Sequence, residues 1–231
     1  MSPAPAEASR TYAILPVKRF ATAKARLDDL SAGTRRALAE SMVTDVIMAL
    51  RRTKAIDQVL IITSEPAAEA IGHGYGVTVL SDDSAQGQSA AALIGIAHAI
   101  EQGATRVLLV PGDCPALDPV QLAELLDRPQ LGRSVTIVPD RHGSGTNALV
   151  LVPPDVIEPA FGEDSRVRHE QAAAAAGVPC HLEQIPSLLI DVDTIDDLEA
   201  LRRLLAEHRG GAAHTRGMLS RLAGRGRSQA G

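Results

Sequence analysis

The 231 residues carry a formal charge of −5 and are 45% hydrophobic, but only 2% are aromatic and none is tryptophan. This length suits one domain with a core of Leu, Val, Ile and Ala, and the acidic balance argues against a nucleic-acid groove, which needs a basic face. No apolar run approaches the ~20 residues of a membrane span, and residues 1–10 lack the basic and apolar regions of a signal peptide. The two cysteines, Cys114 and Cys180, lack metal-binding spacing. We therefore expect a reduced cytoplasmic protein.

Strands and helices alternate through the first 130 residues. After a flexible leader at 1–10, short apolar runs predict strands at 12–17, 59–63, 77–80 and 107–110. Helical patterns predict helices over 34–52, 90–102 and 120–127. This alternation is typical of right-handed βαβ units in a mostly parallel sheet.

The second half of the chain adds a hairpin-like feature. Strand-like residues at 135–138 and 148–152 flank a turn-rich segment, which predicts that one antiparallel strand is mixed into the sheet. A helix at 165–176 and a weaker strand at 180–185 follow, and residues 188–192 lead to Asp193 and Thr194. Thr194 and Asp197 then resemble a capping box for a helix that runs to about residue 208. We therefore predict one α/β domain with three layers over 11–208.

Residues 209–231 differ in composition from the rest. They hold five arginines and no acid, so the first 208 residues carry a formal charge of −10. The Gly- and Arg-rich composition predicts a disordered tail. A solvated tail is the favoured interpretation, and an arm that binds RNA or a protein partner is the alternative.

Asp113 is the first candidate functional residue. It follows Gly112 at the end of the strand at 107–110, and the carboxyl ends of strands are where open α/β sheets bind ligands. A single carboxylate in this place suits a metal site, and a turn cap is an equally good interpretation of the pattern alone.

Four further charged residues also lie near predicted strand ends. Lys18 and Lys24 follow the first strand, and Asp191 and Asp193 precede the last helix. Mg²⁺ is typically held by one or two carboxylates plus substrate phosphates, and lysine supplies a point charge for phosphate. No P-loop, GxSxG or HExxH motif is present. Taken separately, the lysines fit solvated loop charges and Asp193 fits a helix cap. Their shared location at strand ends favours a Mg²⁺-polyphosphate site.

Five motifs carry a resemblance to a known family. They are LPVKRFATAKARL at 15–27, PGDCPALDP at 111–119, DRHGSGTNAL at 140–149, FGEDSRVRH at 161–169 and DVDTIDDL at 191–198. Together they resemble the guanylyltransferases of coenzyme F420 (deazaflavin) biosynthesis over roughly residues 12–205. The resemblance implies a three-layer Rossmann-like nucleotidyltransferase (GT-A-like) fold with a mixed, mostly parallel sheet. One departure from the wider superfamily is that PVKRFATAK replaces its Gly-rich loop after the first strand.

The resemblance also implies a set of site residues. Asp113 and Asp193 would bind Mg²⁺, with Asp191 as a rival that strand alternation places on the same face. The catalytic residues would be Lys18, Lys24 and Asp113, and the nucleotide-binding residues Pro16, Lys18, Lys24, Gly87, Ser89 and Gly112. Residues 63–64 and 86–89 would meet the guanine and ribose.

A second set would hold the small phosphorylated acid. Thr146, Gly162 and Ser165 would form its cradle, because hydroxyls and a glycine amide donate well to phosphate. Asn147 is a further substrate-binding candidate, with Arg141 and His169 as secondary ones. An ordinary helix N-cap is the alternative role for Ser165.

The implied reaction condenses GTP with phosphoenolpyruvate to give enolpyruvoyl-2-diphospho-5'-guanosine and pyrophosphate, with Mg²⁺ as cofactor. The alternatives are the same reaction on 2-phospho-L-lactate or 3-phospho-D-glycerate, another transferase of this fold, or a non-catalytic nucleotide-binding regulator. The expected partners are GTP, the phosphorylated acid and the downstream deazaflavin transferase, with no nucleic acid and no membrane. The motifs set no oligomeric state.

Overall fold

The computed structural model describes residues 9–20, 24, 26–83, 86–128, 132–208 and 210–228. It contains a seven-stranded sheet with the order β3-β2-β1-β4-β6-β5-β7. The strands are β1 (Thr11–Val17), β2 (Gln58–Thr63), β3 (Thr78–Ser81), β4 (Arg106–Leu109), β5 (Ser134–Pro139), β6 (Thr146–Val152) and β7 (Cys180–Leu182). β6 runs antiparallel to both of its neighbours, and the other paired strands are parallel. The prediction of one antiparallel strand in a mostly parallel sheet is confirmed.

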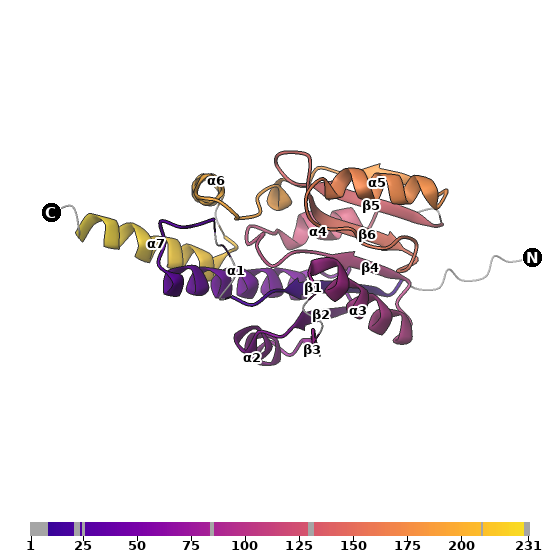
Figure 1. Cartoon of the computed structure of the whole chain (residues 1–231), viewed down its shortest axis with the longest axis horizontal. Coiled ribbons are helices and arrows are strands. Elements are labelled where there is room, and N and C mark those ends of the chain that lie inside the picture. Colours follow the sequence, from indigo (N-terminus) through magenta and orange to yellow (C-terminus); the bar gives the residue numbers. More distant parts are fainter. Residues whose placement is uncertain are drawn as a thin grey trace, which may run out of the picture.

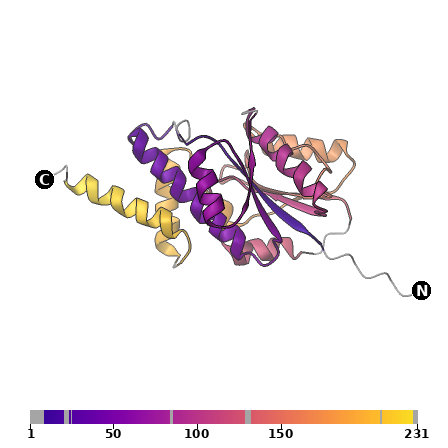
Figure 2. The same ribbon diagram turned by 90° about the horizontal axis from the view of Figure 1, so that it is seen from below.

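The sheet lies between two layers of helices (Figures 1 and 2). Helices α1 (Ala32–Arg52), α2 (Pro66–Gly74) and α4 (Pro119–Leu126) cover one face, and α3 (Gln88–Glu101) and α5 (Ser165–Ala175) cover the other. Strand side chains alternate between faces, so Leu15 packs toward α1 while Ile14, its neighbour on β1, packs toward α3. The three-layer α/β architecture is confirmed.

The order of the strands determines where a ligand can bind. The chain proceeds outward from β1 through β2 to β3 and then returns through α3 to β4, on the other side of β1. β1 and β4 are parallel, so their carboxyl ends lie at the same edge of the sheet. The crevice at such a reversal of strand order is where open α/β sheets bind ligands. Because β6 is antiparallel to β4, its amino end lies at this edge as well.

Several boundaries differ from the sequence predictions. Helix α2 was not predicted, because it has only nine residues and glycines at 72 and 74 interrupt its apolar pattern. Its start is nonetheless well formed, with Pro66 in the first turn and the Glu65 side chain accepting from the Ala67 amide. The strand predicted at 180–185 ends at Leu182, and the short 3-10 helix η1 (Pro186–Leu188) follows it.

The largest correction concerns the C-terminal segment. The predicted disordered tail is wrong for residues 213–228, which form helix α7 (Ala213–Ser228) beside α1 (Figures 1 and 2). Met218 and Leu219 of α7 join a third hydrophobic cluster with α1 and with α6 (Ile195–Glu207). The leader predicted at 1–10 lies outside the described residues, except for its last two.

The hydrogen bonds of two side chains, Asp45 and Arg216, explain why the composition of the tail did not predict this helix. The buried carboxylate of Asp45 on α1 accepts from the amides of His214 and Thr215, at 3.1 and 2.7 Å, and so caps the first turn of α7. Arg216 is engaged within the fold, because its guanidinium donates to four backbone carbonyls between residues 205 and 211. A cap supplied by a distant helix leaves no mark on the local sequence.

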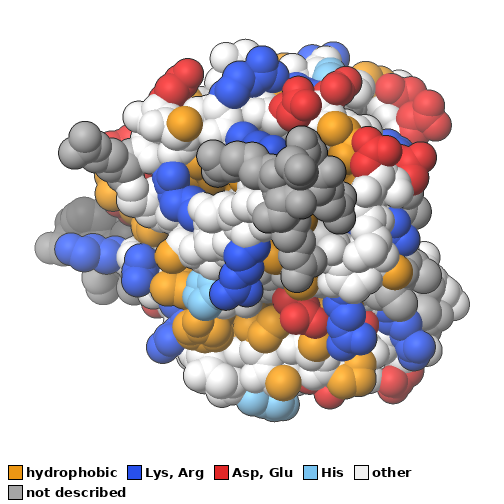
Figure 3. All heavy atoms as spheres, turned by 90° about the vertical axis from the view of Figure 1, so that its left-hand side faces the viewer, with side chains coloured by type: hydrophobic (Ala, Val, Ile, Leu, Met, Phe, Trp, Pro, Cys, Tyr) orange, Lys and Arg blue, Asp and Glu red, His pale blue; other side chains and the backbone are white. Residues whose placement is uncertain are grey.

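The face that carries the end of α7 bears on the alternative of an RNA-binding arm. Among the side chains that the structure describes there, Lys and Arg are interspersed with hydrophobic and acidic groups and form no single basic patch (Figure 3). Within the described parts of the chain, no helix has the length and apolar character needed to cross a bilayer. Cys114 and Cys180 are both free thiols.

The cap of α7 leads to a prediction about stability. Asp45→Ala removes one buried and one partly buried hydrogen bond at the start of α7 and is expected to lower the free energy of unfolding by about 1–2 kcal/mol. Urea unfolding followed by circular dichroism measures this change. Asp29→Ala, at an exposed turn before α1, is the control. Equal unfolding midpoints for the wild type and the Asp45 variant would contradict a stabilising contribution from the cap.

Candidate functional site

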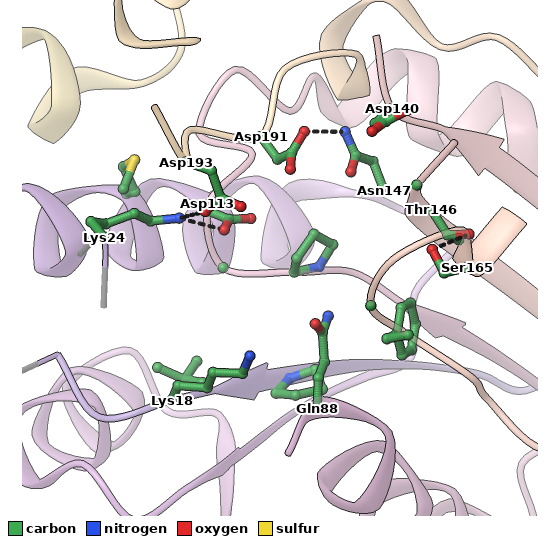
Figure 4. Close-up of a pocket in the computed structure, with 18 of the residues that line it drawn as sticks. Lys18, Lys24, Gln88, Asp113, Asp140, Thr146, Asn147, Ser165, Asp191 and Asp193 are labelled. Atoms are coloured by element: carbon green, nitrogen blue, oxygen red, sulfur yellow. Dashed lines mark hydrogen bonds and ion pairs between the residues drawn. The ribbon is translucent and has the colours of Figure 1, made fainter. Parts of the chain in front are cut away.

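A cavity of about 780 Å³ opens at the edge of the sheet where β1 and β4 end (Figure 4). Eleven predicted site residues line it: Pro16, Lys18, Lys24, Gly112, Asp113, Thr146, Asn147, Gly162, Ser165, Asp191 and Asp193. They come from the end of β1, from the loops after β1 and β4, from the start of β6, from the segment before α5 together with the first residue of α5, and from the segment before α6. The fold thus brings together residues that are up to 177 positions apart, between Pro16 and Asp193.

An ion-pair cluster occupies one side of the cavity. The Lys24 Nζ lies 2.5 Å from Asp113 Oδ2 and 3.0 Å from Asp193 Oδ1, and its side chain is only 7% exposed (Figure 4). Burial lowers the pKa of Lys24, but the charges of Asp113 and Asp193 outweigh burial, and the net pKa is raised above its ordinary value. Lys24 is therefore a fixed positive charge between two carboxylates.

The remaining acid at this edge is held differently. Asn147 Nδ2 donates to Asp191 Oδ1 at 3.2 Å and to the Leu188 carbonyl at 2.8 Å. Burial and then repulsion by Asp113 raise the pKa of Asp191 from 3.8 to about 6. Asn147 was predicted to contact substrate, and the structure shows that its amide orients Asp191 from within the cavity wall.

The donor set can be compared with the needs of a hard divalent cation. Asp113 Oδ1 is buried and has no hydrogen-bond partner among the residues that the structure describes. Within the same ranges, no three Asp, Glu, His or Cys side chains form a group that could hold a metal ion. Mg²⁺ needs only one or two protein carboxylates when substrate phosphates complete its octahedron. The unpartnered oxygen of Asp113 and a second carboxylate from Asp191 or Asp193 fit that pattern.

Asp191 leads to a prediction about pH dependence. Above a pH of about 6, the ionised carboxylate of Asp191 is less favourable in the folded metal-free protein than in the unfolded chain, so it destabilises the fold. This destabilisation disappears as Asp191 gains its proton between about pH 6 and pH 3.8. Asp191→Asn should therefore be more stable than the wild type near neutral pH, by about 1–3 kcal/mol. The difference should shrink toward about pH 4. Thermal unfolding in chelator across this range measures it, and a difference that is constant with pH would contradict the assignment.

Hydroxyl groups form the other side of the cavity. Ser165 Oγ donates to Thr146 Oγ1 at 3.2 Å, and both side chains are nearly buried (Figure 4). Gly162 has φ +113°, a conformation that favours glycine, and its carbonyl accepts from the Ser165 amide. The N-cap of α5 is Asp164, so Ser165 is the first residue of the helix and the N-cap interpretation of its side chain is wrong.

The predicted nucleotide-binding residues divide into two groups. Pro16, Lys18 and Gly112 line the cavity, as does Gln88 at the start of α3 (Figure 4). A Cβ atom on Gly112 would lie 2.9 Å from Val43 Cγ2, so α1 leaves room only for glycine there.

Other predicted residues have supporting positions. Gly87 and Ser89 are not part of the described cavity lining; Gly87 is the N-cap of α3 with φ +105°, and Ser89 Oγ accepts from the Phe161 amide at 2.9 Å. Thr63 is fully buried and its hydroxyl donates to the Val17 carbonyl. Arg141 pairs with Asp197 at 2.6 Å. These residues position the loops around the cavity.

Sequence reasoning missed several lining residues. They include Arg26, Asp140, Phe161 and Glu163. Most lie in loops, where no periodic pattern marks the side chains that point inward. Their position inside or beside the quoted motifs, such as FGEDSRVRH, was the available signal.

Comparisons with known proteins identify chains that are similar to this one. The family model described as "Guanylyl transferase CofC like" matches residues 11–223. A protein of Conexibacter woesei named phosphoenolpyruvate guanylyltransferase is 55% identical over 92% of this chain and 96% of its own. A protein of Sphaerobacter thermophilus with the same name is 35% identical over 83% of this chain and 92% of its own.

Solved structures support the fold class. A crystal structure from Desulfovibrio desulfuricans G20, described as a candidate nucleotide-diphospho-sugar transferase, has a TM-score of 0.71 at 18% identity and covers 92% of this chain and 95% of that one. A likeness at this level of identity concerns the fold, and it confirms the predicted α/β nucleotidyltransferase architecture.

Proposed function

Because this chain belongs to the family of CofC-like guanylyl transferases, we propose that it transfers the guanylyl group of GTP to phosphoenolpyruvate. Two relatives named phosphoenolpyruvate guanylyltransferase match this chain at 55% and 35% identity over most of both chains. The products would be enolpyruvoyl-2-diphospho-5'-guanosine and pyrophosphate, in the biosynthesis of coenzyme F420.

The chemistry is a displacement at phosphorus. A phosphate oxygen of phosphoenolpyruvate attacks the α-phosphorus of GTP, and the bond from that phosphorus to the oxygen bridging to the β-phosphate breaks, so that pyrophosphate leaves. The attacking oxygen is ionised at neutral pH, so the reaction needs no general base. Catalysis then consists mainly of positioning and of offsetting negative charge.

The arrangement of the cavity is the observation that carries this proposal. The Lys24 cluster and the Thr146–Ser165 hydroxyls lie on different sides of the same cavity, with Lys18 on a third (Figure 4). The side with Lys24 and its two carboxylates suits the nucleotide phosphates, and the side with the Thr146 and Ser165 hydroxyls suits the acceptor acid. The two substrates would meet between these sides.

Each residue then has a distinct role. Asp113, with Asp191 or Asp193, would hold Mg²⁺, which when bound neutralises charge on the nucleotide phosphates. Lys18 and Lys24 offset charge that develops on the departing pyrophosphate. Thr146, Ser165 and the backbone at Gly162 hold the acceptor acid. Pro16, Gly112 and Gln88 shape the wall against the nucleotide.

Pyrophosphate release with GTP and Mg²⁺ tests the proposal when it is measured separately with phosphoenolpyruvate, 2-phospho-L-lactate and 3-phospho-D-glycerate. Release with phosphoenolpyruvate at a kcat/KM at least about tenfold above the other two is the expected result, since pockets discriminate small steric differences by roughly 10–200-fold. GTP binding without release for any acid would favour a non-catalytic nucleotide-binding regulator. Faster pyrophosphate release with another acid would show that this acid is the acceptor, and the guanylyl transfer itself would still hold.

The setting of the enzyme follows from the reaction. We expect it to act in the cytoplasm, where GTP and phosphoenolpyruvate are formed. Its diphosphate product would be consumed by a transferase that moves the phosphoenolpyruvyl group to a deazaflavin and releases GMP, and a contact between the two enzymes stays a prediction.

A further inference from the structure

A buried histidine lies directly behind the hydroxyl side of the cavity. His169 on α5 is 0% exposed, and its ring contacts the Phe161 ring edge-on with centroids 5.3 Å apart. Sequence reasoning regarded it only as a secondary candidate. It is not part of the described cavity lining, but both of its ring nitrogens are hydrogen-bonded, and one partner is Thr146.

The partner of one nitrogen determines where the ring proton is. The Ala160 amide lies 2.8 Å from His169 Nε2 and donates to it, since a backbone N–H has no lone pair to accept. Nε2 is therefore unprotonated, and the proton of the neutral ring is on Nδ1. Burial, and then the charge of Arg168, lower the pKa of His169 to about 4, which agrees with a ring that stays neutral.

The proton on Nδ1 in turn determines the role of the Thr146 hydroxyl. His169 Nδ1 lies 3.1 Å from Thr146 Oγ1 and donates to it, and Ser165 Oγ donates to the same oxygen at 3.2 Å. A hydroxyl oxygen has two lone pairs, and both are now used. The hydroxyl hydrogen of Thr146 is then the part of the group left for a further bond, and Thr146 lines the cavity.

We infer that His169 is a positioning residue that makes the Thr146 hydroxyl a donor toward the cavity, so that this subsite accepts an unprotonated phosphate or carboxylate oxygen of the acceptor acid. The inference rests on the proposed function. The inference also gives the proposed function a reason for selectivity. A ligand that presents a neutral hydroxyl as a donor would find no free acceptor at Thr146, because both lone pairs of Oγ1 are used. The Ala160 amide fixes the tautomer of the ring, and the ring fixes the direction of the Thr146 hydroxyl.

A matched pair of variants separates this role from simple packing. His169→Asn places an amide nitrogen near the position of Nδ1 and keeps a donor toward Thr146, whereas His169→Gln places an amide oxygen near Nε2 and keeps only the acceptor for Ala160. We expect His169→Gln to raise the KM for phosphoenolpyruvate about tenfold. His169→Asn should raise it by less than about threefold. The KM for GTP should be unchanged in both, as in the control His181→Gln on the exposed strand β7.

The double variant provides the second readout. If His169 acts through Thr146, adding His169→Gln to Thr146→Val should cause no further rise in KM. Additive effects, an equal loss in the Asn and Gln variants, or a wild-type KM in His169→Gln would each overturn the inference. Inorganic phosphate and pyruvate, used as competitive inhibitors, show whether Thr146 binds the phosphate or the carboxylate of the acceptor acid. The inhibitor that carries the group bound by Thr146 should have a lower affinity for Thr146→Val than for the wild type. Loss for neither would also overturn the inference.

A spectroscopic measurement keeps the test independent of activity. Long-range ¹H–¹⁵N spectra of histidine-labelled wild-type protein should show His169 protonated at Nδ1 and unprotonated at Nε2 near neutral pH. A proton on Nε2 would overturn the inference even if the variants failed to fold. A wild type that shows this tautomer but releases no pyrophosphate with any acid would instead refute the proposed function.

Discussion

Asp113→Asn is expected to lower kcat by at least ~10³-fold while the fold is retained. Asp113 is in the loop after the central strand β4, pairs with Lys24 through Oδ2 and, within the described part of the chain, leaves Oδ1 without a hydrogen-bond partner. Asparagine keeps the shape of the side chain but removes the charge that would hold a cation and that faces Lys24. Pyrophosphate release measures the loss, and thermal unfolding reports whether the fold is intact.

Asp118→Asn is the matched control for this experiment. Asp118 caps α4 by accepting from the Val120 amide at 2.7 Å, and it is not part of the described cavity lining. Asn serves nearly as well as Asp at an N-cap, so both turnover and stability should be close to those of the wild type. Full activity of the Asp113 variant would refute the metal and catalytic assignment of that residue.

Lys24→Met is expected to lower kcat by about 10²–10³-fold without weakening Mg²⁺ binding. In the structure, the ammonium group lies between Asp113 and Asp193. Its loss removes a charge that would offset the departing pyrophosphate, and it leaves both carboxylates without their competing cation. Turnover and a calorimetric Mg²⁺ titration should therefore change in different ways, with affinity for Mg²⁺ equal to or higher than that of the wild type.

Lys54→Met is the control for the charge change, because Lys54 is exposed beyond the end of α1. It should leave turnover and Mg²⁺ affinity unchanged. If the Lys24 variant lost Mg²⁺ affinity together with turnover, the role of Lys24 would be to hold the two acids in place, and a direct effect on the leaving group would be refuted.

The sequence was a good guide to the sheet and a poor one to the C-terminal helix. Apolar runs mark the central strands because both of their faces are buried, as for β1 and β4. Helix α7 depends on hydrogen bonds to Asp45, which is 169 and 170 residues away from the two amides that it caps, and on packing against α1 and α6. Contacts at that separation do not appear in local composition, which is dominated by Gly and Arg.

The site was predictable where a residue's role follows from its place at a strand end. Asp113 and Lys18 follow parallel strands, and Thr146 starts the antiparallel strand β6, so all three lie at the same edge. The roles of Asn147 and Ser89 could not be predicted, because each depends on hydrogen bonds to segments 41 to 72 residues away. Motif membership identified such residues as part of the site, but their contacts required the structure.

Following the α-phosphate of GTP tests the central claim most directly. The wild-type enzyme, incubated with Mg²⁺, phosphoenolpyruvate and GTP labelled at the α-phosphate, should form one labelled adduct that contains the acid, while label at the γ-phosphate should appear only in pyrophosphate. Labelled GMP or GDP without an adduct, or γ-label in inorganic phosphate, would show hydrolysis and contradict guanylyl transfer.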